Sequence, residues 1–166
     1  MTDHVRSARV LDPKYLVDLE TMPVDDLRIM HLECVELETE VSYVRRLTQA
    51  RIDILEADNG RRELGESNED LIRSLPTILA DAGPRAAPAV SHLPLQLAPT
   101  QESEWAPELA EFDGLLANLP MLPDDEIVDA IDRLRALERD VSSERRLLHS
   151  VIDRIDARLG ELLNAQ

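Results

Sequence analysis

Two matching sets of polar residues carry the groups in this sequence that could do chemistry. The first set is Glu38, Ser42, Arg45, Gln49 and Asp53. The second set repeats the same order with one histidine in place of glutamine: Glu138, Ser142, Arg145, His149 and Asp153. A carboxylate accepts hydrogen bonds, a guanidinium donates them in a planar fork, and hydroxyl, amide and imidazole groups can complete polar contacts. The two sets are therefore suited to holding a polar ligand.

The residue types match the hydrogen-bonding edges of a guanine nucleotide. Asp or Glu can accept from the N1 and N2 donors of guanine, whereas Arg can bind O6 and N7 or a phosphate and can stack on a base. Arg46 and Arg146 directly follow the two motif arginines and are candidates for additional ligand contacts. Together these four positive charges offset locally the net charge of -16, so an acidic chain could still hold an anion.

The spacing places each set on one face of a helix. At about 100° per residue, steps of four, three, four and four residues keep all five side chains within an arc of roughly 80°. A polar stripe on a helix is usually only a solvated face. Recurrence of the same serine and arginine beside the same acids favours a functional role over a merely solvated face.

The recurrence extends beyond the polar sets and indicates an internal repeat. Residues 21–58 align without a gap on residues 121–158. The first-copy residues that recur unchanged in the second copy are Pro23, Asp25, Leu37, Glu38, Val41, Ser42, Arg45, Arg46, Leu47, Ile52, Asp53 and Ala57. Composition alone predicts far fewer matches, so we interpret the two segments as a duplication.

Both copies also contain an apolar row with alternating steps of three and four residues, which is typical of a helix pair. The row comprises Leu27, Met30, Cys34, Leu37, Val41 and Val44 in the first copy, and Ile127, Ala130, Leu134, Leu137 and Val141 in the second. Thr48 and Glu144 also fall on it. The polar stripe is rotated by about 100° from this row. An antiparallel pair would bring both stripes to one flank, whereas a parallel pair would separate them.

The remaining composition favours an elongated all-α protein. Four aromatic residues, Tyr15, Tyr43, Trp105 and Phe112, are too few for a large compact core. We expect an antiparallel two-helix coiled coil with short accessory helices and a Pro/Ala-rich linker. The expected units are residues 1–22 with a short helix at 12–20, the first long helix at 23–64, accessory helices and linker at 65–120, and the second long helix at 121–166. Asn59-Gly60 is expected to break or fray the first long helix, and Pro76 is expected to kink or end a short amphipathic helix over residues 67–80.

Several protein classes are disfavoured. The net charge of -16 argues against DNA as a partner and suits a basic protein surface. One cysteine precludes an internal disulfide, and the absence of a secretory or membrane-spanning segment leads us to expect a cytoplasmic protein. Ser142 and His149 are too far apart along one helix face to act as nucleophile and base, so we expect no enzyme. His31, Cys34 and Glu38 share a face, but Cys34 belongs to the apolar row, so no metal is expected.

The spacing E-x3-S-x2-R-x3-Q-x3-D, found from Glu38 to Asp53 and with His for Gln from Glu138 to Asp153, resembles the signature of the RsiG family of actinomycete anti-sigma factors. The resemblance implies an antiparallel coiled coil that binds cyclic-di-GMP as an intercalated dimer on the two motif helices. It further implies that the liganded form holds the sporulation sigma factor WhiG inactive. A coiled-coil adaptor that binds protein without any nucleotide remains the alternative.

Overall fold

The computed structural model describes residues 4–65, 67–81 and 104–164, and within these ranges it contains helices and no strand. The elements in chain order are α1 (Val5–Leu11), the 3-10 helix η1 (Pro13–Leu16), α2 (Val24–Leu64), α3 (Asn68–Asp81), α4 (Ala106–Ala117), the 3-10 helix η2 (Leu119–Met121) and α5 (Asp124–Asn164). The predicted all-helical class is confirmed. Most of the predicted linker falls on residues 82–103, outside the described residues.

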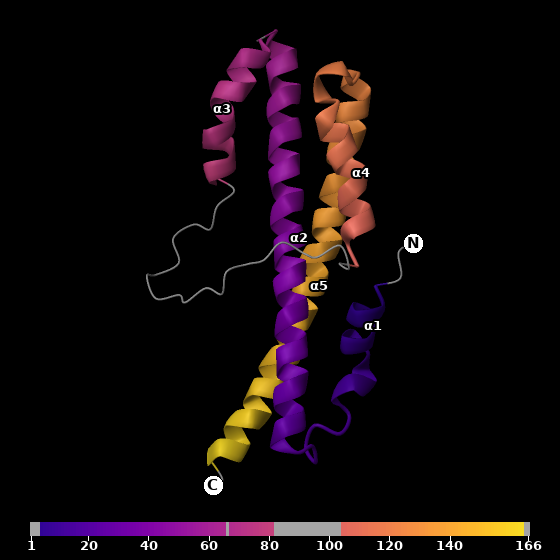
Figure 1. Cartoon of the computed structure of the whole chain (residues 1–166), viewed down its shortest axis with the longest axis vertical. Helices are drawn as coiled ribbons and strands as arrows, with labels where there is room; N and C mark the ends of the chain where they lie inside the picture. Colours follow the sequence, from indigo (N-terminus) through magenta and orange to yellow (C-terminus); the bar gives the residue numbers. More distant parts are fainter. Residues whose placement is uncertain (1–3, 66, 82–103, 165–166) are drawn as a thin grey trace.

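The molecule is built around two long helices of equal length, α2 and α5, that lie side by side (Figure 1). α2 begins at the lower end of the view and α5 begins at the upper end, so the two helices run in opposite directions. Acidic residues occupy the first turn of each, and α2 ends with Arg61 and Arg62. These charges complement the helix dipole. None of the described helices has a stretch apolar enough to cross a lipid bilayer.

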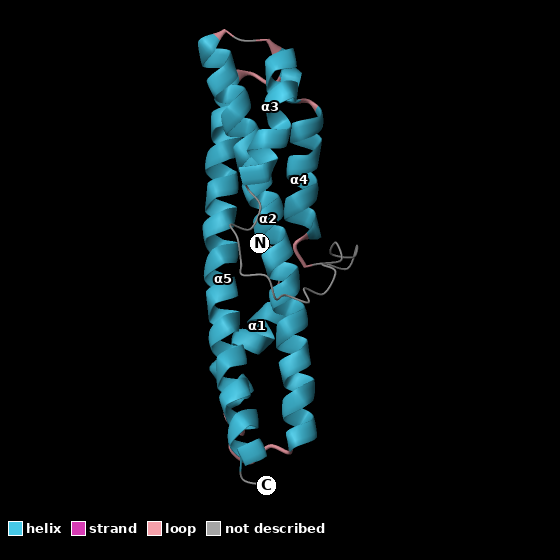
Figure 2. Ribbon diagram, turned by 90° about the vertical axis from the view of Figure 1, so that its left-hand side faces the viewer, coloured by secondary structure: helices cyan, strands magenta, loops and turns pink. Residues whose placement is uncertain are grey.

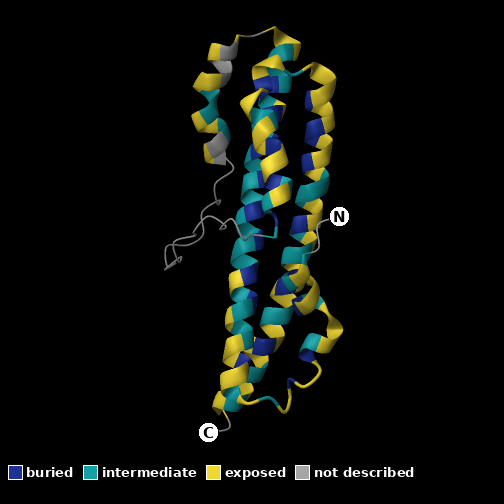
Figure 3. Cartoon of the chain, turned by 45° about the vertical axis from the view of Figure 1, so that its right-hand side comes forward, coloured by how far each residue is buried: buried dark blue, intermediate teal, exposed yellow. Residues whose placement is uncertain are grey.

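The core runs along the contact between α2 and α5 as a row of buried side chains (Figure 3). It includes Leu27, Cys34, Leu37, Val41, Val44 and Leu55 of α2, and Ile127, Ala130, Leu134, Val141, Leu148 and Ile155 of α5. Full burial of a Leu, Ile or Val side chain contributes roughly 1.5–3 kcal/mol. The predicted apolar row is therefore the main source of stability for the pair, whereas supercoiling of the two helices stays a prediction.

Two polar residues on the apolar row, Thr48 and Glu144, are accommodated by hydrogen bonds. Thr48 is fully buried, and its hydroxyl donates to the carbonyl of Val44, one turn earlier, at 2.9 Å. Glu144 is half-buried and accepts a hydrogen bond from the hydroxyl of Ser7 in α1. Because a buried polar group costs little once it is bonded, neither residue interrupts the helix pair.

The accessory helices α1 and α4 both pack beside the long pair, α1 along its lower half and α4 along its upper half (Figure 1). Arg6 of α1 contacts Glu40 of α2 at 3.1 Å, and Arg51 of α2 donates to Asp113 of α4. Leu109 and Phe112 of α4 are buried against the pair, and α4 is one of the short accessory helices expected within residues 65–120.

Three local expectations were wrong. The predicted helix over residues 12–20 is only the 3-10 helix η1, capped by the side chain of Asp12, and the unpredicted helix α1 precedes it. α2 continues without a break through Asn59-Gly60 and ends at Gly65, whose φ of 68° is a left-handed conformation that favours glycine. α3 continues through Pro76 to Asp81, since one lost backbone donor does not end a helix that has further turns beyond it. A rotated view shows α3 in front of the upper part of the long pair (Figure 2).

Candidate ligand site on the paired helices

The two predicted polar stripes face each other across the contact between α2 and α5. Arg145 of α5 donates from Nε to Oε1 of Glu38 at 2.9 Å and to Oγ of Ser42 at 2.7 Å, both on α2. In the other direction, Nη1 of Arg45 lies 3.9 Å from Oε1 of Glu138. Each pair joins the glutamate of one copy to the arginine of the other. Exchanging the two copies therefore maps one pair onto the other, as the predicted pseudo-two-fold arrangement requires.

Glu38 is the centre of the first half of this site. Its Oε1 accepts hydrogen bonds from Ser42 at 2.6 Å, Arg145 at 2.9 Å and His149 at 3.0 Å. Burial alone would raise the pKa of Glu38, but the hydrogen bonds from Ser42, His149 and Arg145, together with the charge of Arg145, hold it below its ordinary value. The carboxylate is therefore firmly ionised at neutral pH.

The second half of the site is bonded more loosely. Glu138 accepts a hydrogen bond from Ser142 at 2.7 Å, the counterpart of the Ser42–Glu38 bond, and meets Arg45 only at 3.9 Å. Gln49 donates to Asp53 on its own helix at 3.0 Å. The positions matching Gln49 and Asp53 in the second copy, His149 and Asp153, are exposed. All ten motif residues thus lie on α2 and α5, but they form two unequal halves.

Two arginines of α2 retain unsatisfied donors at the site. Nε of Arg45 and Nη2 of Arg46 are buried, and neither atom has a hydrogen-bond partner among the described residues. Arg46 also donates from Nε to the carbonyl oxygen of Ser42 at 3.2 Å. A buried donor without an acceptor is costly, so an acceptor-rich ligand placed here would gain from pairing with it. Arg146 on α5 is exposed.

The motif flank lies away from α1. Glu40, which contacts α1, follows Glu38 by two residues and so projects about 200° further around α2. Glu144, also bonded to α1, is likewise displaced from Ser142 by about 200° on α5. α1 therefore approaches the pair from the flank opposite the motif residues. A ligand on the motif flank would therefore not have to displace α1.

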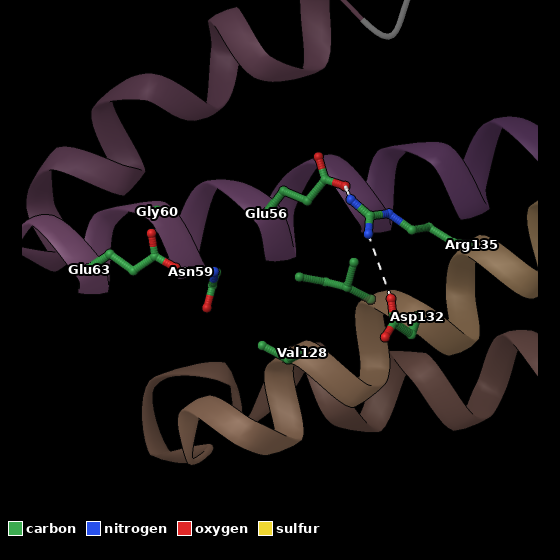
Figure 4. Close-up of a pocket in the computed structure, with 8 residues that line it drawn as sticks. Glu56, Asn59, Gly60, Glu63, Val128, Asp132 and Arg135 are labelled. Carbon is green, nitrogen blue, oxygen red and sulfur yellow. Dashed lines mark hydrogen bonds and ion pairs between the residues drawn. The ribbon is translucent and has the colours of Figure 1, made fainter.

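The same flank continues as a groove between the two helices, which our reading of the sequence did not identify. Residues of both helices line it: Glu56, Asn59, Gly60 and Glu63 of α2, and Val128, Ile131, Asp132 and Arg135 of α5 (Figure 4). Its volume is about 340 Å³. Arg135 bridges it by donating to Glu56 at 2.8 Å and lying 3.6 Å from Asp132. Glu56 and Arg135 each directly follow a buried leucine, the same spacing that places Glu38 after Leu37.

The alternative chemistries considered for these residues find no support in the geometry. Ser142 and His149 are engaged with different carboxylates, Glu138 and Glu38, and so do not form a nucleophile–base pair. Cys34 is buried in the core, and His31 lies against Asp156 of α5 at 3.0 Å. Within the described ranges, no group of three or more His, Cys, Asp or Glu side chains is arranged to hold a metal ion.

The fold and the site define an all-helical binding protein with a duplicated polar site on one flank of two antiparallel helices. A family model described as RsiG-like matches residues 13–79, which include η1, α2 and the complete first motif. The match covers less than half of the chain and supports its similarity to the RsiG family through this region. The RsiG-like match indicates a regulator of the anti-sigma type. No curated protein matches the chain.

Proposed function

We propose that this protein binds cyclic-di-GMP on its paired motifs and, in the liganded form, sequesters a WhiG-type sigma factor. The observation that carries this proposal is the pair of contacts across the helices, Arg145 with Glu38 and Arg45 with Glu138. They bring two copies of one recognition set to a single flank. A ligand with its own two-fold symmetry, such as an intercalated dimer of cyclic-di-GMP, could then bind both copies in the same way.

The chemistry of each half suits guanine and phosphate together. A glutamate can accept from guanine N1 and N2, while an arginine can bind O6 and N7 or a phosphate oxygen. In the unliganded protein the same groups pair with one another, so a bound nucleotide exchanges these contacts for its own. Such an exchange leaves few buried charges unpaired at either stage, which keeps its net cost low.

The regulatory consequence follows from linkage. If ligand and sigma factor bind the same protein cooperatively, a fall in cyclic-di-GMP weakens the hold on sigma and frees it for RNA polymerase. By the same equilibrium, the sigma factor tightens ligand binding by an equal factor. The strongly acidic chain suits a sigma factor, because a promoter-binding protein must present basic surface.

The test is isothermal titration calorimetry with cyclic-di-GMP, with and without a WhiG-type sigma factor. We expect saturable binding that becomes tighter when the sigma factor is present. Cyclic-di-AMP at equal concentration serves as a ligand control, since adenine lacks the N1 and N2 donor pair of guanine, and GTP serves as a second control with a single guanine base. Saturable binding of the sigma factor without any heat from cyclic-di-GMP would instead identify a protein adaptor that needs no nucleotide.

A further inference from the structure

The two halves of the site differ in how fully their glutamates are occupied. Oε1 of Glu38 accepts three hydrogen bonds, from Ser42, Arg145 and His149. The matching oxygen of Glu138 accepts one, from Ser142 at 2.7 Å, and has Arg45 only at 3.9 Å. The side chains of both glutamates are similarly enclosed, with 19% and 25% exposed. The difference therefore lies in their partners and not in their access to solvent.

One part of this difference comes from the one motif position at which the two copies differ. His149 reaches across from α5 and contacts Glu38 at 3.0 Å. Its counterpart Gln49 donates within α2 to Asp53 at 3.0 Å and not to Glu138. A histidine ring is rigid, and its Nε2 extends far enough to bridge the two helices here. The additional hydrogen bond that His149 gives Glu38 therefore coincides with the one sequence difference between the motifs.

This difference bears on how a guanine base can enter. Guanine presents N1–H and N2–H side by side, so a carboxylate binds it best when both of its oxygens can accept. At Glu138 the base meets a carboxylate that accepts a single short hydrogen bond, from Ser142. At Glu38 it must first displace His149 and compete with Arg145 for the same oxygen, and hydrogen bonds between charged groups are the strongest ones to give up.

We propose that the two halves are filled unequally: the half formed by Glu138 and Arg45 takes the first guanine base, and His149 restrains the half formed by Glu38 and Arg145. The proposal rests on the proposed binding of cyclic-di-GMP and adds an order to it. In this scheme His149 is a positioning residue that sets the affinity of the half formed by Glu38 and Arg145. Gln49, which is engaged with Asp53, leaves the half formed by Glu138 and Arg45 open.

The test compares matched variants of the full chain by calorimetry with cyclic-di-GMP. Glu138→Gln should weaken the overall affinity by about tenfold more than Glu38→Gln, because it removes the half that is filled first. His149→Gln should tighten binding by several-fold, since it releases Glu38 while keeping a polar side chain. The reverse change, Gln49→His, should weaken binding by closing the half formed by Glu138 and Arg45. Circular dichroism and thermal unfolding check that each variant keeps its helices.

Three results would overturn the proposal. These are equal losses for Glu38→Gln and Glu138→Gln, a larger loss for Glu38→Gln, or unchanged affinity in His149→Gln. They differ from failure of the proposed function, in which the unaltered protein gives no saturable heat with cyclic-di-GMP. His149 is about half exposed, so its replacement should leave the fold intact and the affinity comparison interpretable.

Discussion

The hydroxyl of Ser7 in α1 donates a hydrogen bond to the carboxylate of Glu144, which stands on the core row in the middle of α5. Glu104, just before α4, accepts from the backbone N–H of Arg6 at 2.6 Å and so satisfies a free donor at the start of α1. Two carboxylates from distant parts of the chain thus fasten a helix of seven residues. α1 depends on these tertiary contacts because so short a helix is marginal on its own.

Glu144→Gln is predicted to raise stability at neutral pH. Burial raises the pKa of Glu144 above its ordinary value of 4.5, Ser7 and His4 oppose this, and the nearby charges of Glu104 and Glu40 add to it. A carboxyl with a raised pKa binds its proton more tightly in the folded state, so its contribution to stability falls as the pH rises above 4.5. Glutamine can still accept from Ser7 but carries no charge.

Thermal unfolding measured from pH 4 to pH 8 tests this prediction. The melting temperature of Glu144→Gln should exceed that of the unaltered protein by a margin that grows with pH. A constant margin would show that the charge of Glu144 is not the cause. Glu36→Gln, at an exposed position of α2, is the matched control and should leave the pH profile unchanged.

Arg62→Met is predicted to destabilise the chain by about 2–4 kcal/mol. Arg62 donates to the carbonyl oxygens of Leu119 at 2.7 Å and Leu122 at 2.6 Å, and thereby ties the end of α2 to the turn before α5. It also donates to Asp58 at 2.8 Å, whose side chain is 2% exposed. Removal leaves that buried charge and two carbonyls short of donors.

Urea unfolding followed by circular dichroism measures the effect of Arg62→Met. Arg28→Met serves as the control, since Arg28 is 61% exposed and pairs only with exposed Asp25 among the described residues. That change should alter the free energy of unfolding by less than about 0.5 kcal/mol. Equal effects of the two changes would contradict the role assigned to Arg62.

Arg51→Met is predicted to raise the free energy of unfolding by about 1 kcal/mol. Arg51 is a buried residue on the core row, and two of its guanidinium nitrogens, Nε and Nη1, are buried with no partner among the described residues. Its only ion pair there is with Asp113 of α4, which is largely exposed. The equivalent position of the second copy is Val151, so the row accepts an apolar side chain. Urea unfolding checks the sign, and a loss of stability would show that the ion pair outweighs the burial of the unpaired donors.

Arg145→Met is predicted to weaken cyclic-di-GMP binding by at least about tenfold while leaving the helices folded. Arg145 makes two hydrogen bonds across the site, to Glu38 and Ser42, and its side chain is 37% exposed. The loss therefore concerns charge-assisted contacts and not packing. Fluorescence polarisation with a labelled cyclic-di-GMP measures the affinity, with Arg28→Met again as control. An unchanged affinity would show that Arg145 does not contribute to ligand binding.

Much of the helix arrangement was predictable because it depends on repeated, local patterns. Apolar residues recur at steps of three and four along each long helix, for example Leu37 and Val41 on α2 and Val141 on α5. This spacing predicts both the length of α2 and α5 and the face that each buries. The rotation of Glu38 and Glu138 away from that face follows from helix geometry alone. For this reason the common flank of the two stripes could be predicted before any coordinates were known.

The remaining features depend on partners that spacing does not indicate. α1 has no capping side chain of its own and is held by Glu104 and Glu144, which lie about a hundred residues or more away. The helix continues through Gly60 because Arg61 and Arg62 bind Asp58 on the preceding turn and anchor the segment. Likewise, only side-chain geometry shows that His149 crosses to the other helix whereas Gln49 stays on its own.

Because both recognition sets lie in a single chain, each motif is encoded by its own codons. In an assembly of two identical chains, every amino-acid replacement appears twice and alters both halves together. Here a change at position 49 or at position 149 modifies one half and leaves the other as it was. A symmetric ligand can in this way be bound by two adjacent half-sites of different affinity. A single codon change can then alter the binding curve of the protein.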